Sequence, residues 1–239
     1  MEIHYYDSLP STNRTAVQAA RAGAGEFYTV VAKSQTEGRG RMERSFFSPE
    51  GGTYFSTVLR PQCGFEQFGR ITPVAAVAVH RAVLQLLGVP LQIKWINDLL
   101  LDGKKVCGIL AESGVDVNGK PYVVLGIGIN TAPVEFPPEL ACSADFVSCT
   151  DTAALIGAIL AELMQYEECI AEGNWCDYYR KHCVCLGRIV EVIKQGNIRP
   201  AYAHDVSPDG GLCVEYQDGS KEILRGGEIS LRLVQTFEI

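Results

Sequence analysis

Apolar and polar positions over the first 185 residues predict a mixed arrangement of strands and helices. Short apolar runs, several of them alternating with polar residues, predict strands at 3–6, 29–32, 54–59, 91–95, 99–101, 105–112 and 122–130. Longer apolar runs with flanking capping residues predict helices at 14–21, 72–87, 151–172 and 175–181. Thr72-Pro73 suits the start of its helix, with Thr72 as the cap. This helix is apolar on nearly every side, so we expect it at the centre of the core.

The strands between residues 91 and 130 follow one another through short turns, as in an antiparallel meander. Asp102-Gly103 is a strong hairpin signal among them. Gly126, Gly128 and Asn130 alternate onto one face, where two missing side chains leave a trough with an amide at its end. A helix packed closely against the glycines explains the same pattern, and both readings stay open. Residues 131–149, with three prolines, predict an irregular crossing segment.

The character of the chain changes at about Gly187. Short strands are predicted at 188–193, 201–206, 212–216, 222–224 and 229–234, separated by glycine-containing turns. Such a series suggests a small β-barrel. We therefore expect an α+β fold with two domains, 1–185 with a mixed or antiparallel sheet and flanking helices, and 186–239 with the barrel.

Composition narrows the classes of function. The 239 residues are 47% hydrophobic and 21% charged, as in ordinary globular proteins, and the net charge of −7 argues against a broad nucleic-acid surface. The first residues lack the basic start and apolar centre of a signal peptide. The apolar run 74–87 is interrupted by His80, Arg81 and Gln85, which argues against a membrane span. We expect a cytoplasmic protein without a membrane partner.

Nine cysteines, an odd number, fit a reducing compartment better than a disulfide framework. Cys169, Cys176 and Cys183 repeat every seven residues, which on one helix is one face. A structural zinc site normally has two close pairs of ligands, and no second pair accompanies Cys183 and Cys185. We expect buried thiols without metal, because cysteine behaves as a small hydrophobe.

The segment 35–54 lies between two predicted strands and is rich in glycine and charge, and a loop of that length in a compact domain is usually functional or disordered. Gly38 and Gly40 allow backbone N–H groups to approach a ligand. Arg39 and Arg41, two residues apart, would point the same way in an extended segment and would suit a carboxylate or a phosphate. A solvated loop whose charges are balanced by nearby glutamates explains the same residues, and on this segment alone it is the more common case.

Several motifs occur in order along nearly the whole chain. They are Ser11-Thr12-Asn13, Gln35 with Gly38-Arg39-Gly40-Arg41, Lys94-Trp95-Ile96-Asn97-Asp98, Lys105-x-x-Gly108-Ile109-Leu110, Gly126-x-Gly128-x-Asn130 and Gly226-Gly227-Glu228-Ile229-Ser230-Leu231. In this order and spacing the chain resembles biotin protein ligase (biotin–[acetyl-CoA-carboxylase] ligase). It departs from the usual pattern at Ile96, where the family usually has proline, at Met42-Glu43-Arg44, and at Phe46, where tryptophan is frequent.

The resemblance implies a catalytic domain related to class II aminoacyl-tRNA synthetases, followed by an SH3-like barrel. It also implies a ligase with ATP and Mg²⁺ that converts biotin to biotinyl-5′-AMP and passes the biotinyl group to a lysine of a biotin carboxyl carrier domain. Such chemistry needs positive charge where a carboxylate meets a triphosphate, and no nucleophile from the enzyme.

Matched residue by residue, the resemblance implies the following roles. Biotin would be bound by Ser11, Thr12, Asn13, Gln35, Arg39, Gly40, Arg41 and Lys105, of which Arg39, Arg41 and Lys105 would be catalytic. The nucleotide would lie near Arg41, Tyr54, Asn97, Asp98, Lys105 and Asn130, with Asp98 as a partner for Mg²⁺. For Tyr54, stacking on adenine and a place in the core both stay open.

Two other functions remain as alternatives. A lipoate–protein ligase would adenylate a different acid, and a non-catalytic binder would keep the cleft alone; the intact Arg39, Arg41 and Lys105 argue against the second. Some family members carry an N-terminal DNA-binding domain. Because the first strand begins at residue 3, we expect the form without it and no DNA partner. A homodimer through an exposed sheet edge stays open.

Overall fold

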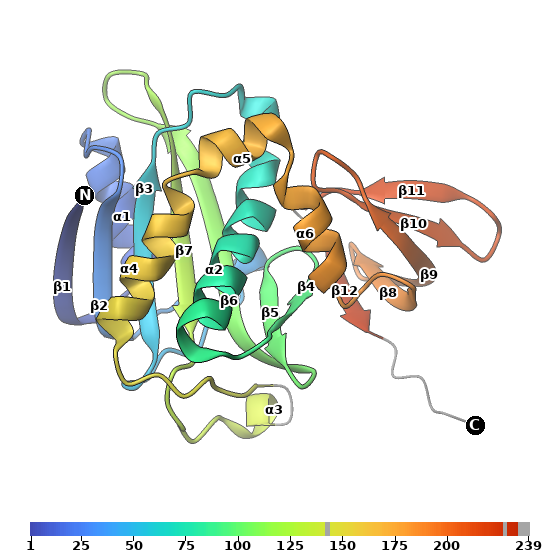
Figure 1. Cartoon of the computed structure of the whole chain (residues 1–239), viewed down its shortest axis with the longest axis horizontal. Helices are drawn as coiled ribbons and strands as arrows, with labels where there is room; N and C mark the ends of the chain where they lie inside the picture. The colour runs from blue at the N-terminus through green and yellow to red at the C-terminus, as the bar shows by residue number, and fades with distance from the viewer. Residues whose placement is uncertain (142–143, 227–228, 234–239) are drawn as a thin grey trace.

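Two β-sheets and a layer of helices make up the computed structural model of the chain, which describes residues 1–141, 144–226 and 229–233. Figure 1 shows the larger sheet and its helices on one side of the molecule and the smaller sheet on the other. The α+β class and the mixed sheet expected from the sequence are confirmed.

The larger sheet has seven strands in the order β1-β2-β3-β7-β6-β5-β4. They are β1 (Glu2–Leu9), β2 (Tyr28–Gln35), β3 (Thr53–Leu59), β4 (Gln92–Lys94), β5 (Asp98–Leu101), β6 (Lys104–Val115) and β7 (Pro121–Ile129). Within the described residues β1 and β2 pair in parallel and the other neighbours pair antiparallel. Asp102 and Gly103 both have positive φ, as the expected tight hairpin between β5 and β6 requires.

The two faces of this sheet carry different helices. Val30 packs with Ala16 and Ala20 of α1 (Thr12–Arg21), whereas Val31, the next residue, belongs to the main core. Consecutive strand residues point to opposite faces, so α1 covers one face and the main core lies on the other. At the centre of that core is α2 (Ile71–Leu87), in contact with α4 (Thr152–Leu163), α5 (Tyr166–Glu172) and α6 (Trp175–His182).

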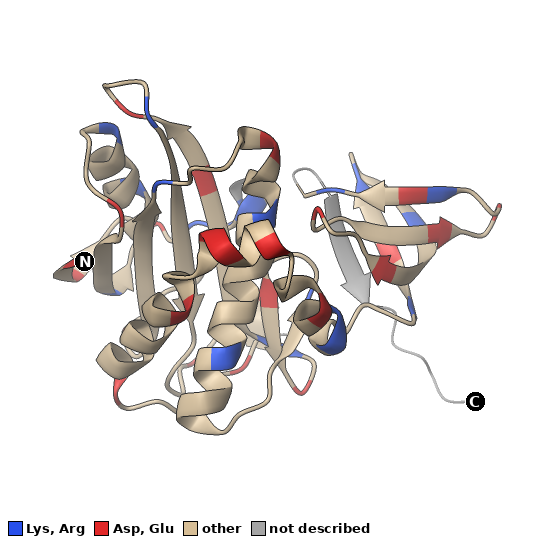
Figure 2. Ribbon diagram, turned by 45° about the horizontal axis from the view of Figure 1, so that its top comes forward, with Lys and Arg blue, Asp and Glu red and all other residues tan. Residues whose placement is uncertain are grey.

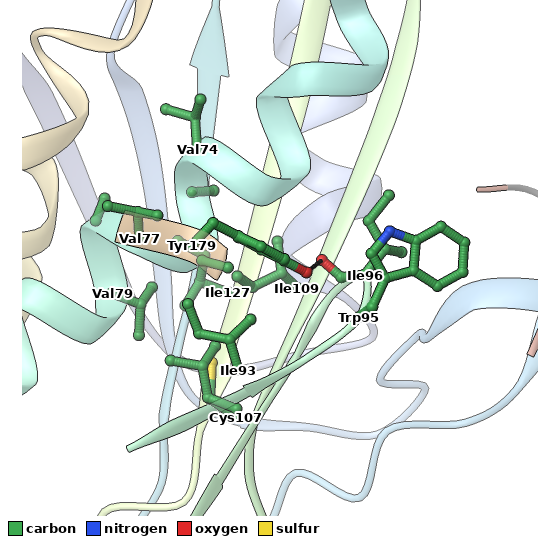
Figure 3. Close-up of a cluster of buried hydrophobic side chains, with 14 of the residues drawn as sticks. Val74, Val77, Val79, Ile93, Trp95, Ile96, Cys107, Ile109, Ile127 and Tyr179 are labelled. Carbon is green, nitrogen blue, oxygen red and sulfur yellow. Dashed lines mark hydrogen bonds between the residues drawn. The ribbon is translucent and has the colours of Figure 1, made fainter. Parts of the chain in front are cut away.

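Figure 3 shows the part of the core where α6 meets the sheet. Tyr179 is fully buried among branched side chains such as Ile93 and Val77, and its hydroxyl donates to the Ile96 carbonyl at 3.4 Å. Burial raises the pKa of this phenol well above its ordinary value, so it stays a neutral donor. The bond ties α6 to the segment between β4 and β5, which faces the candidate site.

Two helix predictions were wrong in detail. Thr72 does not cap α2, because a 3₁₀ turn at Phe65–Arg70 leads directly into a helix that begins at Ile71. This 23-residue stretch, Phe65–Leu87, is long and apolar enough to cross a membrane by length and composition, but 61% of its most apolar window is buried inside the protein. The helix expected at 151–172 is divided into α4 and α5 by a turn at Met164 and Gln165.

The smaller sheet has five antiparallel strands in the order β11-β10-β9-β8-β12. Its strands are β8 (Arg188–Lys194), β9 (Asn197–Val206), β10 (Leu212–Tyr216), β11 (Lys221–Leu224) and β12 (Ile229–Leu233). They match the five predicted strands. Gly227 and Glu228 of the last sequence motif lie outside the described residues. A short helix, α3 (Pro138–Ala141), interrupts the irregular segment that was expected at 131–149.

The two sheets are joined by buried contacts. The Trp95 indole Nε1, next to β4, donates to the Gly210 carbonyl in the turn between β9 and β10 at 2.9 Å. Arg180 of α6 donates to Asp205 and to the Val206 carbonyl at the end of β9. One continuous cluster of buried side chains runs from the large sheet to Ala203 and Leu212. The two parts therefore pack as a unit.

The cysteines are distributed differently from the helical face that was expected. Cys169 lies on α5, Cys176 on α6 and Cys183 beyond the end of α6, because the chain turns twice between them. The eight cysteines within the described residues are free thiols. That part of the chain also holds no group of three or more His, Cys, Asp or Glu residues arranged for a metal. The metal-free state stays a prediction.

The contact between the sheets gives a test of stability. Trp95→Phe removes the indole donor and leaves the Gly210 carbonyl without it, so we expect the free energy of unfolding to fall by about 1–3 kcal/mol beyond the loss of packing. Trp175→Phe is a matched control, because Trp175 is equally buried and its Nε1 has no hydrogen-bond partner among the described residues. Urea unfolding of both variants measures the difference; equal losses would contradict the role of the Trp95 bond.

Candidate active site

A cavity of about 270 Å³ gathers most of the residues that the sequence motifs singled out. Its lining includes Ser11, Thr12, Asn13, Gln35, Arg39, Gly40, Arg41, Asn97, Asp98 and Lys105, together with Gly108, Gly126 and Gly128. These residues come from the start of α1, the end of β2, the loop after it, the β4–β5 turn, β6 and β7. Of the predicted site residues, all except Tyr54 and Asn130 line this cavity.

The floor of the cavity has no side chains at three positions of two paired strands. Gly108 of β6 pairs with Gly128 of β7, and Gly126 lies two residues further along the same face. A Cβ at Gly128 would stand 2.6 Å from the Phe46 ring, and one at Gly126 would overlap Asn13 Oδ1. Both readings of the glycine pattern hold: the glycines form a trough, and the start of α1 packs closely against one end of it.

Hydrogen bonds fix the polar wall at the α1 end. Ser11 caps α1 by accepting from the Arg14 N–H, and Thr12 donates to Gln35 Oε1 through both its backbone N–H (2.8 Å) and its hydroxyl (3.0 Å). Gln35 Nε2 in turn donates to Ser48 Oγ at 2.9 Å. The oxygen of the Gln35 amide therefore faces Thr12 and its nitrogen faces Ser48, so the wall presents a fixed set of donors and acceptors.

Five cations line the cavity, and the motifs singled out Arg39, Arg41 and Lys105 among them. Arg39 Nη1 lies 3.0 Å from Glu112 Oε1, Arg41 Nη1 donates to Asn97 Oδ1 at 2.9 Å, and Lys105 Nζ lies 2.7 Å from Asp98 Oδ1. Burial lowers the pKa of Arg41 from its ordinary value, and the nearby Asp98 carboxylate opposes this shift. The cavity can thus offer concentrated positive charge to a bound anion.

The loop that carries the two arginines folds back on itself. Gly40 N–H donates to the Arg44 carbonyl at 2.7 Å and Phe46 N–H to the Gly38 carbonyl at 2.8 Å, and Met42 between them has a positive φ of 57°. A Cβ at Gly38 would collide with the Phe46 carbonyl, so this conformation requires glycine there. The fold of the loop brings Arg39 and Arg41 to the same cavity, as their spacing predicted.

Tyr54 is a core residue and is not available to a nucleotide. Its side chain is 1% exposed, its hydroxyl donates to the Pro49 carbonyl, and its ring meets the edge of Phe46. Of the two alternatives for Tyr54, the structure therefore supports the place in the core and not stacking on adenine, because the ring is buried. Asn130, expected near the nucleotide, is also buried, and its amide donates to the Asp145 carbonyl at 2.8 Å. It ties the irregular segment 131–149 to the end of β7.

Sequence reasoning missed Ser48, Ser56 and Glu112 as neighbours of the motif residues. Ser56 Oγ lies 2.8 Å from Thr12 Oγ1 and 2.6 Å from Asn13 Oδ1, and Glu112 Oε2 accepts from Asn13 Nδ2 at 2.8 Å. Each is an isolated polar residue in or beside a strand. The one available signal was Glu112 on the same strand face as Gly108 and Leu110.

A second cavity, of about 650 Å³, adjoins the first. Arg41, Met42, Ile109 and Leu110 line both. The second cavity extends to the turn at Asp209–Gly211 and to Arg225, so the smaller sheet forms part of its wall. In the view of Figure 2, acidic and basic residues are interspersed over the helices and both sheets rather than separated by sign.

Comparisons with known proteins give a consistent picture. The family model described as "Biotin/lipoate A/B protein ligase family" matches residues 5–130, and the model "Biotin protein ligase C terminal domain" matches residues 185–232. A Bacillus spizizenii protein named "Bifunctional ligase/repressor BirA" is 42% identical over 92% of this chain and 71% of the relative. A Mycobacterium tuberculosis biotin–[acetyl-CoA-carboxylase] ligase is 29% identical over 93% of this chain and 86% of the relative.

Solved structures show the same architecture. The biotin protein ligase from Aquifex aeolicus, determined in complex with biotin and ATP, superposes with a TM-score of 0.84 and 25% identity, covering 98% of this chain and 99% of that one. Against one Bacillus subtilis relative, by contrast, the match spans 43% of the relative's length. With both family models matched and the fold shared, this chain belongs to the biotin/lipoate A/B protein ligase family.

Proposed function

We propose that this chain is an ATP-dependent biotin–protein ligase, which activates biotin as biotinyl-5′-AMP and transfers it to a lysine of a biotin carboxyl carrier domain. One observation carries the proposal. A wall of fixed hydrogen-bonding groups and the cations Arg39, Arg41 and Lys105 line the same cavity, and between them lies a floor of glycines that Phe46 and Asn13 approach closely. The wall suits the polar ureido ring, the trough suits an alkyl chain, and the cations suit the carboxylate and the phosphates.

In the first step, a biotin carboxylate oxygen attacks the α-phosphorus of ATP. A new oxygen–phosphorus bond forms, the bond between the α-phosphorus and the bridging oxygen breaks, and pyrophosphate leaves. Carboxylate and triphosphate repel each other, so the barrier falls when fixed positive charge surrounds the reacting atoms. Arg39, Arg41 and Lys105 supply this charge, and the burial of Arg41 strengthens its effect.

In the second step, the neutral amine of the carrier lysine attacks the acyl carbon of the adenylate. The carbon–nitrogen bond forms, the bond from carbon to the phosphate oxygen breaks, and AMP leaves. The mixed anhydride is already reactive, so the enzyme needs to orient the amine and exclude water rather than provide a nucleophile. The loop carrying Arg39 and Arg41 lies at the cavity and is suited to cover it.

Magnesium enters as part of the substrate MgATP. Mg²⁺ keeps several waters and phosphate oxygens and usually takes only one or two carboxylates from a protein. Asp98 fits this requirement, because its carboxylate lines the cavity, is 23% exposed and already faces a cation, Lys105. Asn97 lies beside it, and we place the phosphates of the nucleotide near these three residues.

The finer architecture belongs to the same proposal. We assign residues 1–185 to a catalytic domain of the class II aminoacyl-tRNA synthetase type and 186–239 to an SH3-like domain, and we place the protein in the cytoplasm. The proposal concerns ligation alone. Lipoate ligation is the second candidate, since the family model covers both activities, but the match of residues 185–232 to a C-terminal domain of biotin protein ligases favours biotin.

Lys105 gives a direct test of the function. With biotin, MgATP and a carrier domain, the parent protein should add one biotinyl group to the carrier, as read by intact mass. Lys105→Ala should lower the rate by about 100- to 1,000-fold, because one lost charge contact at a crowded anion is worth that much. Lys105→Arg should also fail, since a planar fork does not replace a compact ammonium.

The neighbouring Lys104 provides the control for that test. Lys104 lies on the same strand and is half-exposed, 3.8 Å from Asp145, outside the cavity lining. Lys104→Ala should transfer biotin at nearly the parent rate. A folded Lys105→Ala protein that biotinylates the carrier as fast as Lys104→Ala would remove the role assigned to Lys105.

The arginine loop gives a second prediction. It buries little apolar surface, so we expect it to become more firmly ordered when Arg41 meets an anion. Trypsin should cut the free protein after Arg39, Arg41 or Arg44, and saturating biotin with MgATP should slow this cleavage. Arg41→Ala should weaken the protection at the remaining sites. Cleavage after the exposed Lys194, at the end of β8 beside the turn to β9, is the internal control; an equal change at both places would mean that the arginine loop does not cover the bound ligand.

A further inference from the structure

Glu112 stands at one end of the glycine trough and contacts both the polar wall and the arginine loop. It follows Gly108 and Leu110 on the same face of β6, opposite Val124 of β7. Val124 belongs to the small apolar cluster beneath α1, with Ala16 and Ala20. Glu112 is therefore the charged residue at the boundary between that cluster and the cavity.

We propose that Glu112 is a positioning residue, whose carboxylate holds Asn13 of the wall and Arg39 of the loop at the same time. Glu112 Oε2 accepts from Asn13 Nδ2 at 2.8 Å, and Glu112 Oε1 accepts from Arg39 Nη1 at 3.0 Å. The two oxygens thus join α1 to the loop, which lie 26 positions apart in the chain as counted from residue 13 to residue 39. The inference rests on the proposed function, in which both partners face biotin.

The bond to Glu112 determines which end of the Asn13 amide faces which neighbour. A carboxylate only accepts, so the amide nitrogen must point toward Glu112 and Oδ1 toward Ser56, 2.6 Å away. Oδ1 then lies against Gly126, where a Cβ would overlap it. One amide N–H and part of the Oδ1 acceptor capacity remain for a ligand, in a fixed orientation.

A carboxylate at this place is not what packing alone would select. Its side chain is 27% exposed, and a charge removed from water is costly unless it is paired. An apolar residue would continue the cluster beneath α1 at no such cost. The two bonds to Asn13 and Arg39 explain the charge, and both partners line the cavity.

Holding Arg39 also affects how the loop responds to a ligand. In this structure the Arg39 guanidinium is paired with Glu112, so the loop is held near the cavity before an anion arrives. A ligand that hydrogen-bonds Asn13 therefore meets a wall whose position is linked to that of the loop. Through the Glu112 carboxylate, binding of a ligand at the Asn13 end of the cavity is coupled to the position of Arg39.

Glu112→Gln tests the coupling with almost no change of shape. Glutamine has one acceptor oxygen and one NH₂ group, so it can satisfy either Asn13 or Arg39 and presents a donor to the other. We expect the Kd for biotin, measured by calorimetry without ATP, to rise about tenfold, as for one misplaced hydrogen bond. Tryptic cleavage of the loop in the free protein should become faster. Glu168→Gln, at an exposed position on α5, should change neither quantity.

A double-mutant cycle separates positioning from a general structural effect. In the Asn13→Ala background, Glu112→Gln should change the biotin Kd by less than about threefold, because the group through which it acts is gone. Glu112→Asp, which keeps two acceptor oxygens, should bind biotin more tightly than Glu112→Gln. If the glutamine variant does not fold, Glu112→Asp replaces it in the same cycle. Glu112→Asp should then weaken biotin binding when Asn13 is present and should not weaken it further in the Asn13→Ala background.

Parent-like biotin binding in Glu112→Gln, or the same loss of affinity with and without Asn13, would overturn the inference. These outcomes differ from a failure of the proposed function, in which the parent protein itself would not bind biotin.

Discussion

Three positions without side chains on two paired strands are the constraint on which the rest of the site depends. Gly108, Gly126 and Gly128 leave a strip of bare backbone on the face of the sheet that α1 partly covers. Asn13 can approach the strip from α1, and Phe46 can lie over it from the loop, only because no Cβ is there. The depth of the cavity and the reach of the loop therefore follow from backbone geometry before any charged group is considered.

Three of the cations around this strip have partners within the protein. Arg39 meets Glu112, Arg41 meets Asn97, and Lys105 meets Asp98. Such pairing offsets the cost of holding these cations in one cavity. It also means that a substrate must provide better contacts than the protein partners do, which a carboxylate beside a triphosphate achieves by its concentrated negative charge. Binding and activation then depend on exchanging one set of partners for another.

Much of the fold could be read from local patterns, and the errors share a cause. Strands and the Asp102-Gly103 hairpin depend on periodicity and turn chemistry within a few residues, and these predictions are confirmed. After the break between α4 and α5, Tyr166 and Ile170 of α5 are buried in the core. Met164 and Gln165 are not helix-breaking residues, so the local sequence does not predict the break. The sequence motifs identified most of the residues that line the cavity. The burial of Tyr54 and the role of Glu112 depend on what packs against them from distant segments, which spacing in the chain does not encode.

In the proposed function, this cavity activates the carboxylate of biotin in preference to that of other acids. Exchange of labelled pyrophosphate into ATP tests it most directly, because the exchange reports formation and reversal of the adenylate without any carrier protein. Exchange should be rapid with biotin and at background level when lipoate replaces it. Exchange supported equally by lipoate, or absent with biotin, would contradict the account.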